Sequence, residues 1–350
     1  MRLAIDAMGN DNGPGPIIEG VRDYVAADRG TEVLLVGREP VLQPLLHEAG
    51  LNGSSRVRVV HADDVIEMDD KLQALREKRE SSIGRTVQLV KDGEADGMVA
   101  LGNTMAAVAS TRLGLKYLEG VHRAGIAVPM PAAHGVCVVI DMGANVNCKP
   151  RHLCAYAIMA AAYARLVLGI EAPRVGLLNV GEEDVKGNTV AKEAFALLSE
   201  APTRFIGNVE GGDIFNGKCD VVVCDGFVGN AVLKASEAVA AAMADILRDN
   251  IRRSWLCTLG AVLARPAIKE LKRKANSDQY GGAPLLGVDG VCIIGHGGSN
   301  PTAVRNALRV AHESVAQGLN GVIHEKLIQA NGVLHAPADA EQNAAAARSA

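Results

Sequence analysis

The chain has 350 residues, of which 48% are hydrophobic and 22% charged, a composition typical of a globular protein with a sizeable core. A net charge of −4 and an aromatic content of 3% argue against a nucleic-acid-binding protein, which needs a basic surface and often stacks bases on aromatic rings. Seven cysteines without a CxxC pair are expected to be reduced core thiols, with no disulfide or zinc framework.

The cysteine pattern favours a cytoplasmic protein, and two apolar runs bear on secretion and membrane insertion. Asp6 interrupts the apolar N-terminus, so no secretory signal is expected there. The longest apolar run, residues 155–164, is too short to span a bilayer and predicts a buried helix.

Strand-like and helix-like segments alternate from the N-terminus. Strands are predicted at 2–6, 32–36, 57–61, 97–101, 125–128, 135–140, 175–180, 221–223 and 291–294. Between the early strands, helices are predicted at 16–27, 41–49 and 70–91. This alternation predicts an α/β fold with a mostly parallel sheet and helices on both of its faces.

Several predicted strands end in polar, glycine-rich loops. The first strand ends at Asp6 and leads into a loop that contains Gly9, and the fourth leads into Asn103 and Thr104. Either of these two residues can cap the following helix, bind a ligand, or do both. The loop 141–147 contains Asn145, and unpaired amides beside a core are costly, which favours a role in a site. His296 lies between glycines after the last strand, although a lone histidine is more often structural.

The stretch 220–234 has the clearest pattern for anion binding. Its buried strand ends at Asp225 and Gly226, and an Ala-rich helix follows Asn230. A helix N-terminus offers backbone N–H groups and a partial positive charge, which suit a phosphate or an oxyanion.

The stretch 174–188 repeats this pattern. Its strand leads into Gly181, Glu182 and a second acid, and a helix is expected to begin near Lys186. Because parallel strands end at the same edge of a sheet, the two loops are expected to meet. Lys186 and Asn230 would then supply a cation and an amide at a shared crevice.

The segment 246–274 carries eight basic residues against two acids within an acidic chain. It is predicted to be an amphipathic hairpin that breaks at Pro266. Two interpretations stay open: contact with an anionic membrane or an acidic protein, or a dimer-interface helix pair with a solvated basic rim. The contact residues would be Arg248, Arg252, Arg253, Trp255, Arg265, Lys269, Lys272 and Arg273. Residues 331–350 are predicted to be a disordered tail.

Seven motifs together resemble the bacterial phosphate acyltransferase family, which makes acyl phosphate for phospholipid synthesis. They are MGNDNGP, LGNTMAA, DMGANVNC, LLNVGEEDVKGN, CDGFVGN, DQYGGAPLLGVDG and GHGGSNP, and they run in order from Met1 to about Leu327. This resemblance implies a two-lobed α/β/α sandwich of the isocitrate and isopropylmalate dehydrogenase type. The expected lobes are 1–105 with 285–330, and 106–284 with the dimer interface.

The resemblance also implies the reaction and its residues. A fatty acyl group would pass from acyl carrier protein to inorganic phosphate, without a metal or a cofactor, and a glycerol-3-phosphate acyltransferase would act downstream. Lys186 and Asn230 would have the catalytic roles. Phosphate or substrate would lie among Asp6, Gly9, Asn103, Thr104, Asn145, Gly181, Glu182, Asp225, Gly226 and His296. The protein would be a homodimer in the cytoplasm that touches the inner face of the cell membrane.

Three positions depart from the usual family pattern. Asn10 and Met105 stand where glycine is usual, and Asn147 stands where aspartate is usual. Added bulk beside the site would affect rate or chain preference. The alternatives are a phosphate acetyltransferase that uses coenzyme A, a decarboxylating dehydrogenase, and a membrane scaffold that binds acyl carrier protein without turnover. The dehydrogenase would need a nicotinamide pocket and a metal-binding acid cluster, and neither is evident in the sequence.

Overall fold

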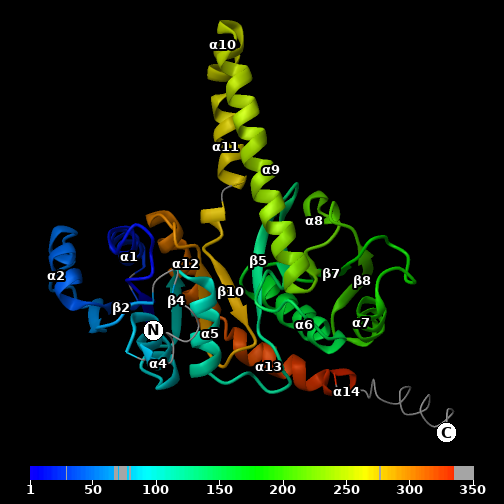
Figure 1. Cartoon of the computed structure of the whole chain (residues 1–350), viewed down its shortest axis with the longest axis horizontal. Helices are drawn as coiled ribbons and strands as arrows, with labels where there is room; N and C mark the ends of the chain where they lie inside the picture. Colours follow the sequence, from blue (N-terminus) through cyan, green and yellow to red (C-terminus); the bar gives the residue numbers. More distant parts are fainter. Residues whose placement is uncertain (29, 67–69, 71–76, 79, 276, 335–350) are drawn as a thin grey trace.

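The protein is described here by a computed structural model that covers residues 1–28, 30–66, 70, 77, 78, 80–275 and 277–334, without the side chains of 272, 274, 275 and 277. Within these residues one sheet has the order β3-β2-β1-β4-β11-β10-β5-β6-β9-β7-β8 (Figure 1). The strands are β1 Arg2–Asp6, β2 Glu32–Gly37, β3 Val57–His61, β4 Gly97–Leu101, β5 Gly125–Ala132, β6 Gly135–Ile140, β7 Arg174–Leu178, β8 Arg204–Val209, β9 Val221–Val223, β10 Ala283–Leu286 and β11 Val291–Gly295.

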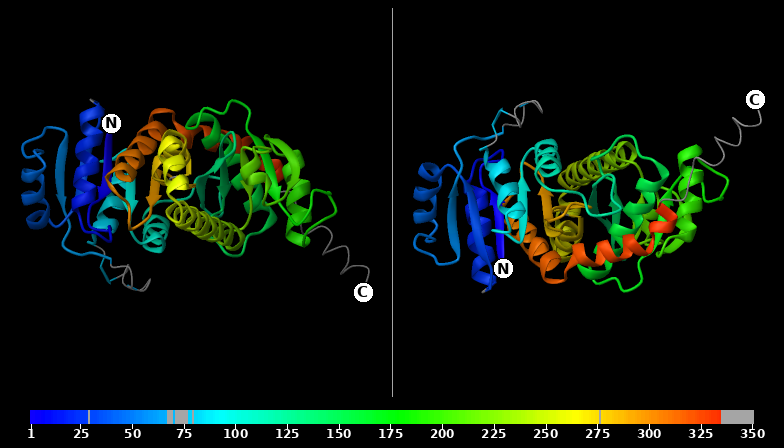
Figure 2. Two further views of the ribbon diagram at one scale, coloured as in Figure 1. Left: turned by 90° about the horizontal axis from the view of Figure 1, so that it is seen from above. Right: turned by 90° about the horizontal axis from the view of Figure 1, so that it is seen from below.

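Helices cover both faces of this sheet, as predicted (Figure 2). They are α1 Gly15–Ala27, α2 Glu39–Glu48, α4 Ser82–Lys91, α5 Thr104–Gly114, α6 Pro150–Leu166, α7 Thr189–Glu200, α8 Asp213–Asn216, α9 Gly226–Arg252, α10 Trp255–Leu263, α11 Arg265–Ala275, α12 Pro301–Ala316, α13 Leu319–Gln329 and α14 Asn331–Leu334. Side chains along a strand point alternately to the two faces of the sheet, and each face has its own helix layer. In β1, Leu3 and Ile5 pack in the core that includes α1 and α12, whereas Ala4 packs in another core cluster.

The helix pair α1 and α12 shows how closely these layers pack. A Cβ atom added at Gly20 of α1 would lie 2.4 Å from Cβ of Val304 in α12. Only glycine permits this helix-to-helix distance, so Gly20 is a packing position in the core.

The direction of the strands reverses in the middle of the sheet. Strands β1, β2, β3, β4 and β11 are parallel to one another, and β10 is antiparallel to both β11 and β5. The hairpin of β5 and β6 is antiparallel, and β6, β9, β7 and β8 are parallel again. The sheet is therefore mostly parallel, as predicted, but its two parallel sets point in opposite directions.

Most predicted elements are present, and several boundaries were wrong. Strands β8 and β10 were missed, and β7 ends at Leu178 rather than Val180. The buried run 155–164 lies inside α6, where nearly every side chain is buried. Of the predicted helix 70–91, α4 covers Ser82–Lys91, while residues 71–76 and 79 lie outside the described residues.

The helices α9, α10 and α11 project together from the body of the molecule as a stem with α10 at its tip (Figure 1). The predicted break at Pro266 is present, but it lies slightly earlier in the chain, at Ala264. The chain turns before Trp255 and again at Ala264, and Pro266 is the second residue of α11, where proline is tolerated because its missing N–H has no helical partner.

The C-terminal part of the described chain packs onto the second half of the sheet. Both α13 and α14 contact α6, and α14 also contacts α7. Residues 331–334 are helical and Leu334 is buried, so the predicted disordered tail was wrong there; residues 335–350 lie outside the described residues. The lobe boundaries stay a prediction.

The cysteines largely meet the expectation of core thiols, and all seven are free. Five of them are buried and Cys148 is partly buried. Cys257 is the exception, because it lies exposed on α10.

Candidate functional site

The carboxylate of Asp141 organises the loop that follows β6. It is fully buried, and its two oxygens accept hydrogen bonds from the backbone N–H groups of Ile126, Ala144 and Asn145 at 2.7–3.0 Å. The side-chain amide of Asn145 donates a further bond of 3.0 Å. Burial raises the pKa of Asp141, and these hydrogen bonds offset part of that rise.

Asn145 joins this loop to two other elements. Its Nδ2 donates to the carbonyl of Ala124 at 2.6 Å and to the hydroxyl of Tyr156 at 2.9 Å, and its carbonyl accepts the N–H of Gly226 at 2.9 Å. The sequence marked Asn145 as a site residue, but Asp141 and Tyr156, which hold it in place, were not selected. An acid at the end of a buried strand was the available signal for Asp141.

The N-terminus of α9 lies directly on this loop. A Cβ atom at Gly229 would lie 2.0 Å from the carbonyl oxygen of Asp141, so only glycine fits there. An added Cβ at Gly143 would lie 3.6 Å from Cβ of Asn230. The loops after β6 and β9 are therefore in contact beside Asn230, whose own side chain is exposed.

The predicted supply of free N–H groups at this turn was overestimated. Helix α9 begins at Gly226 rather than after Asn230, and Asp225 is its N-cap through a 2.9 Å bond from the N–H of Val228. The N–H of Gly229 donates to the carbonyl of Asp225. Among the described residues only Phe227 in this first turn keeps a backbone N–H without a partner.

Lys186 lies in a loop rather than at the start of a helix. Its N–H donates to the carbonyl of Glu183 at 3.0 Å, and its carbonyl accepts the side-chain amide of Asn179 at 3.1 Å. Helix α7 begins at Thr189, with Asn188 as its cap through a 2.9 Å bond. The backbone of Lys186 is thus held from both sides, while its side chain is half exposed and its Nζ is 3.8 Å from the Glu183 carboxylate.

The acids of this loop have different partners. Glu182 forms a 2.6 Å ion pair with Lys218, which also contacts Asp213 at 3.3 Å. The carbonyl of Glu183 accepts a bond from Asn208 at the end of β8. Glu182 is therefore tied to the segment after α8, and Gly181 is buried beside the side chains of Glu183 and Lys186. Asn179 and Asn208 were not selected from the sequence.

A hollow with about 290 Å³ of empty space opens beside Asn145. Most of its lining is apolar, and it lies between the C-terminal half of α5 and the loop after β6. The lining residues are Val108, Arg112, Tyr117, Ala124, Ala144, Asn145, Leu285 and Val288. Arg112 adds a positive charge that sequence reasoning did not select.

The remaining predicted site residues lie at the ends of β1, β4 and β11. Asp6 is buried, accepts the N–H of Met8 at 3.0 Å, and has a pKa raised by burial. A Cβ atom at Gly9 would lie 3.1 Å from Oδ2 of Asp6. Asn103 caps α5 through the N–H of Ala106, next to the exposed Thr104. His296 is exposed and accepts the N–H of Gly298.

The three residues that depart from the usual family pattern, Asn10, Met105 and Asn147, fit the structure without backbone strain. Among the described residues no residue other than glycine has a positive φ, so Asn10 needs no glycine-like conformation. Its amide donates to the carbonyl of Ser299 at 2.9 Å, which links the loops after β1 and β11. Met105 and Asn147 are exposed, and their side chains do not press on the core.

The structure brings the predicted residues together in two groups. Strands β6, β9 and β7 are adjacent and parallel, so the loops that carry Asn145, Asn230 and Lys186 follow strands that end at one edge of the sheet. That the loops of Lys186 and Asn230 meet there stays a prediction. The second group, with Asp6, Asn103 and His296, follows β1, β4 and β11, which run in the opposite direction to β6, β9 and β7. Within the described residues no hydrogen bond or ion pair joins Lys186 to Asn230, and no group of three His, Cys, Asp or Glu residues could hold a metal ion.

The chain is similar to known proteins over nearly its whole length. Residues 1–321 match the family described as fatty acid synthesis protein. The phosphate acyltransferase of Heliobacterium modesticaldum is 46% identical over 328 residues, covering 93% of this chain and 98% of the relative. The phosphate acyltransferase of Pelotomaculum thermopropionicum is 47% identical over 321 residues, covering 91% and 93%.

Solved structures share the fold at low sequence identity. The EutD phosphotransacetylase from Staphylococcus aureus has a TM-score of 0.60 at 14% identity, covering 90% of this chain and 94% of that one. A phosphotransacetylase from Streptococcus pyogenes has a TM-score of 0.61 at 15% identity, with the same coverage. At such identities the likeness establishes the α/β sandwich alone.

Proposed function

The chain belongs to the fatty acid synthesis protein family, and we propose that it transfers a fatty acyl group from acyl carrier protein to inorganic phosphate at the edge where β6, β9 and β7 end. The observation that supports this placement is the contact of the loop after β6 with the start of α9, at the edge where the adjacent strand β7 also ends. Asp141 and Asn145 hold the N-terminus of α9, and the adjacent parallel strand β7 brings Lys186 to the same edge.

The reaction needs positioning and charge compensation more than an activated nucleophile. A phosphate oxygen attacks the thioester carbonyl carbon, the C–S bond breaks, and the pantetheine sulfur leaves as a thiolate. Lys186 offsets the phosphate charge, and Asn230 with the N–H of Phe227 donates to the developing oxyanion. Asp225 is already bound as the N-cap, so it orients the helix rather than the substrate.

The apolar hollow beside Asn145 suits the acyl chain. Five of its lining residues are Val, Leu or Ala, and methylene groups bury favourably against such side chains. Its position between α5 and the loop after β6 puts it next to the backbone that holds Asn230. We assign this hollow to the first carbons of the chain.

The stem supports three further parts of the proposal. Val239, Met243, Ile246 and Leu247 are exposed apolar residues on α9, which suits pairing with a second copy of the chain. At the tip no residue of α10 is buried. A short apolar helix flanked by Arg252, Arg253 and Arg265 suits the surface of an anionic membrane, so the protein would lie in the cytoplasm at the inner face of the membrane.

The same stem does not support a membrane-spanning interpretation. Helix α9 is long and apolar enough to cross a bilayer by length and composition alone. Its first turn, however, is held against Asn145 and Asp141 in the body of the protein. Charged residues at Asp245, Arg248 and Asp249 also lie along its distal half.

The basic rim is the proposed contact for acyl carrier protein, which is acidic. Arg248 and Arg273 are paired within the stem to Asp245 and Glu270. Among the described residues Arg252, Arg253, Arg265 and Lys269 form no ion pair, so they are the better candidates, while the side chain of Lys272 lies outside the described residues. The acyl phosphate product would pass to a glycerol-3-phosphate acyltransferase.

The decisive experiment measures phosphate-dependent loss of long-chain acyl thioester from acyl carrier protein. The Lys186→Ala variant is expected to lose roughly 10²- to 10³-fold in rate, because it removes the cation that offsets phosphate charge. Lys192→Ala is a matched control, since Lys192 is an exposed lysine on the neighbouring helix α7.

The outcomes separate the alternatives. Equal rates for the Lys186 and Lys192 variants would show that Lys186 does not act at the reacting centre. Turnover of the acyl thioester of coenzyme A, but not of the acyl thioester of acyl carrier protein, would favour the acetyltransferase interpretation. Binding of carrier protein without consumption of phosphate would favour a scaffold.

A further inference from the structure

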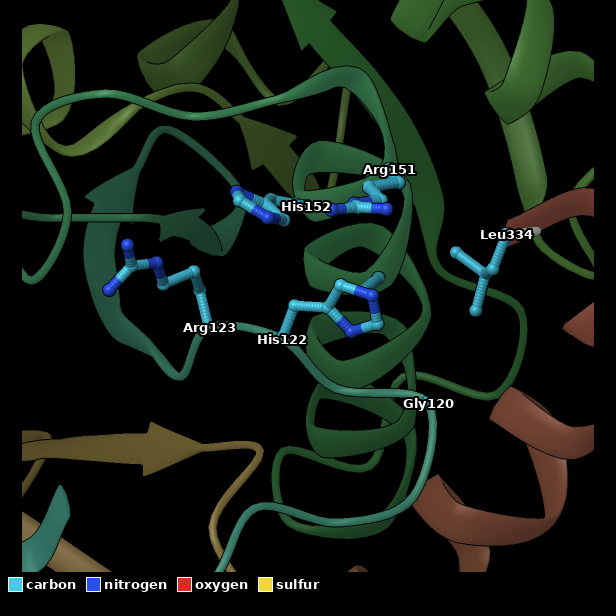
Figure 3. A pocket seen from close by; sticks show the side chains of 7 residues that line it. Gly120, His122, Arg123, Arg151, His152 and Leu334 are labelled. Carbon is cyan, nitrogen blue, oxygen red and sulfur yellow. The ribbon is translucent and has the colours of Figure 1, made fainter. Parts of the chain in front are cut away.

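A second hollow, with about 250 Å³ of empty space, lies at the first turn of α6 (Figure 3). Its walls come from the segment before β5, the start of α6 and the end of α14. The lining residues are Gly120, His122, Arg123, Arg151, His152, Ala155 and Leu334. None of them is a site residue named above, and none is acidic.

The two arginines of this hollow have no counter-charge. Among the described residues neither Arg123 nor Arg151 has an ion pair, and no side-chain hydrogen bond satisfies either guanidinium. The Nε atom of Arg151 is inaccessible to solvent and has no hydrogen-bond partner. A buried donor without an acceptor is costly, and no acceptor can reach this enclosed atom, so the donors that Arg151 offers to a ligand are its terminal nitrogens.

His152 is a further donor in the same hollow. The residue is 7% exposed, and its Nδ1 accepts the backbone N–H of Lys149 at 3.2 Å. The proton of the neutral ring is therefore on Nε2, which has no partner among the described residues. Its ring lies edge-on to that of His122, with centroids 6.3 Å apart.

The electrostatic field in the hollow is positive. Burial, together with the smaller effect of the charges of Arg151, Arg123, His122 and Lys149, lowers the pKa of His152 to about 4. Helix α6 has seventeen residues, and its N-terminus adds a partial positive charge at the same place. A bound anion would relieve this repulsion and would accept hydrogen bonds from the terminal nitrogens of Arg151, which have no hydrogen-bond partner among the described residues.

We propose that this basic hollow binds the phosphate group of inorganic phosphate or of a phosphate monoester, at a position separate from the reacting centre. Arg123 and Arg151 bind the anion as charged donors, and Nε2 of His152 completes its hydrogen bonds. This inference does not rest on the proposed reaction.

The hollow has a direct connection to the proposed reacting centre. Arg123 precedes Ala124, whose carbonyl accepts the side chain of Asn145. Arg151 and His152 begin the helix that follows the loop of Asp141. An anion held by Arg123 and Arg151 would therefore restrain the two segments that position Asn145.

The test uses the full chain with Lys186→Ala, so that phosphate binding at the reacting centre is weakened in every sample. Calorimetric titrations with inorganic phosphate and with methyl phosphate are compared for this protein and for versions that also carry Arg123→Gln or Arg151→Gln. Each added change is expected to weaken phosphate binding at least about tenfold, since it removes a charged donor. Arg165→Gln, at the exposed other end of α6, is the matched control and is expected to bind as the parent does.

An independent readout locates the anion. In protein labelled with ¹³C-histidine, the imidazole signal assigned through His152→Asn is expected to shift on adding phosphate and to titrate at a higher pH. Tighter binding of methyl phosphate than of inorganic phosphate would identify an ester ligand, and the reverse would identify the free ion. Unchanged affinity in both arginine variants, or an unmoved His152 signal at saturating phosphate, would overturn the proposal.

Discussion

At the scale of single residues, Asp141 has more structural influence than the residues that would touch substrate. Its carboxylate accepts four hydrogen bonds from three residues, and its backbone carbonyl lies against Gly229. The catalytic candidates Lys186 and Asn230 are exposed by comparison. Their positions therefore depend on buried polar groups beneath them, of which Asp141 is the clearest.

The change Asp141→Asn tests this dependence. It keeps the shape of the side chain but replaces an acceptor oxygen by an NH₂ group that faces backbone donors. Two buried N–H groups then lose their acceptor, so we expect the free energy of unfolding to fall by about 2–4 kcal/mol. Acyl transfer should fall as well, because the N-terminus of α9 loses its support. Denaturant unfolding and the thioester assay measure the two effects.

The control for Asp141→Asn is Asp289→Asn, which changes an exposed acid. Its effect on the free energy of unfolding should stay within about 0.5 kcal/mol. If both variants unfold at the same denaturant concentration as the unchanged protein, the hydrogen bonds of Asp141 do not stabilise the loop.

At the scale of elements, the stem consists of helices whose apolar residues the single chain does not bury. Helix α10 is nine residues long, and Trp255, Leu256 and Leu263 are more than 60% exposed. A monomeric soluble protein rarely exposes such a group of large apolar side chains together. The tip is therefore the part of the chain most suited to a lipid surface.

The change Leu263→Glu should weaken binding to vesicles of phosphatidylglycerol and phosphatidylcholine by about tenfold or more. It removes the burial of one large apolar side chain and adds a charge that the anionic surface repels. Cosedimentation measures the bound fraction. Val41→Glu, on the distant helix α2, should bind as the unchanged protein does. Equal binding of the two variants would move the membrane contact away from the tip.

At the scale of the whole molecule, the stem lies beyond the compact body and offers α9 to a partner (Figure 1). Only Gly226 and Gly229 of α9 are buried in the single chain. A long amphipathic helix normally buries its apolar stripe, and the partner proposed for this stripe is a second copy of the chain, which carries the same surface.

The change Met243→Glu should convert the protein from a particle of twice the chain mass to one of the chain mass in sedimentation velocity. The reason is that a charge would enter the apolar stripe at the middle of α9. Glu237→Gln, on the same helix, should leave the assembly unchanged. A dimer that persists in Met243→Glu would place the contact on another surface.

The sequence by itself determined the local elements and the motifs. Runs such as Val221–Val223, ending at Asp225 and Gly226, specify a buried strand and its turn through short-range propensity and burial. The motifs identified the family and the loops that carry Lys186 and Asn230. Asn103 as a cap and the buried run inside α6 were also local properties, and both predictions are confirmed.

Only the tertiary structure decided the direction of the strands and the partners of the buried polar groups. Strand β10 carries a proline and is four residues long, so its pattern is weak, yet its antiparallel pairing with β11 and β5 joins the two halves of the sheet, and the β5–β6 hairpin then reverses the second half. The bond from the N–H of Ile126 to Asp141 crosses the β5–β6 hairpin, and Arg123 and Arg151 line the same hollow although they belong to different segments of the chain. Such contacts depend on long-range packing, which local propensity and periodicity do not encode.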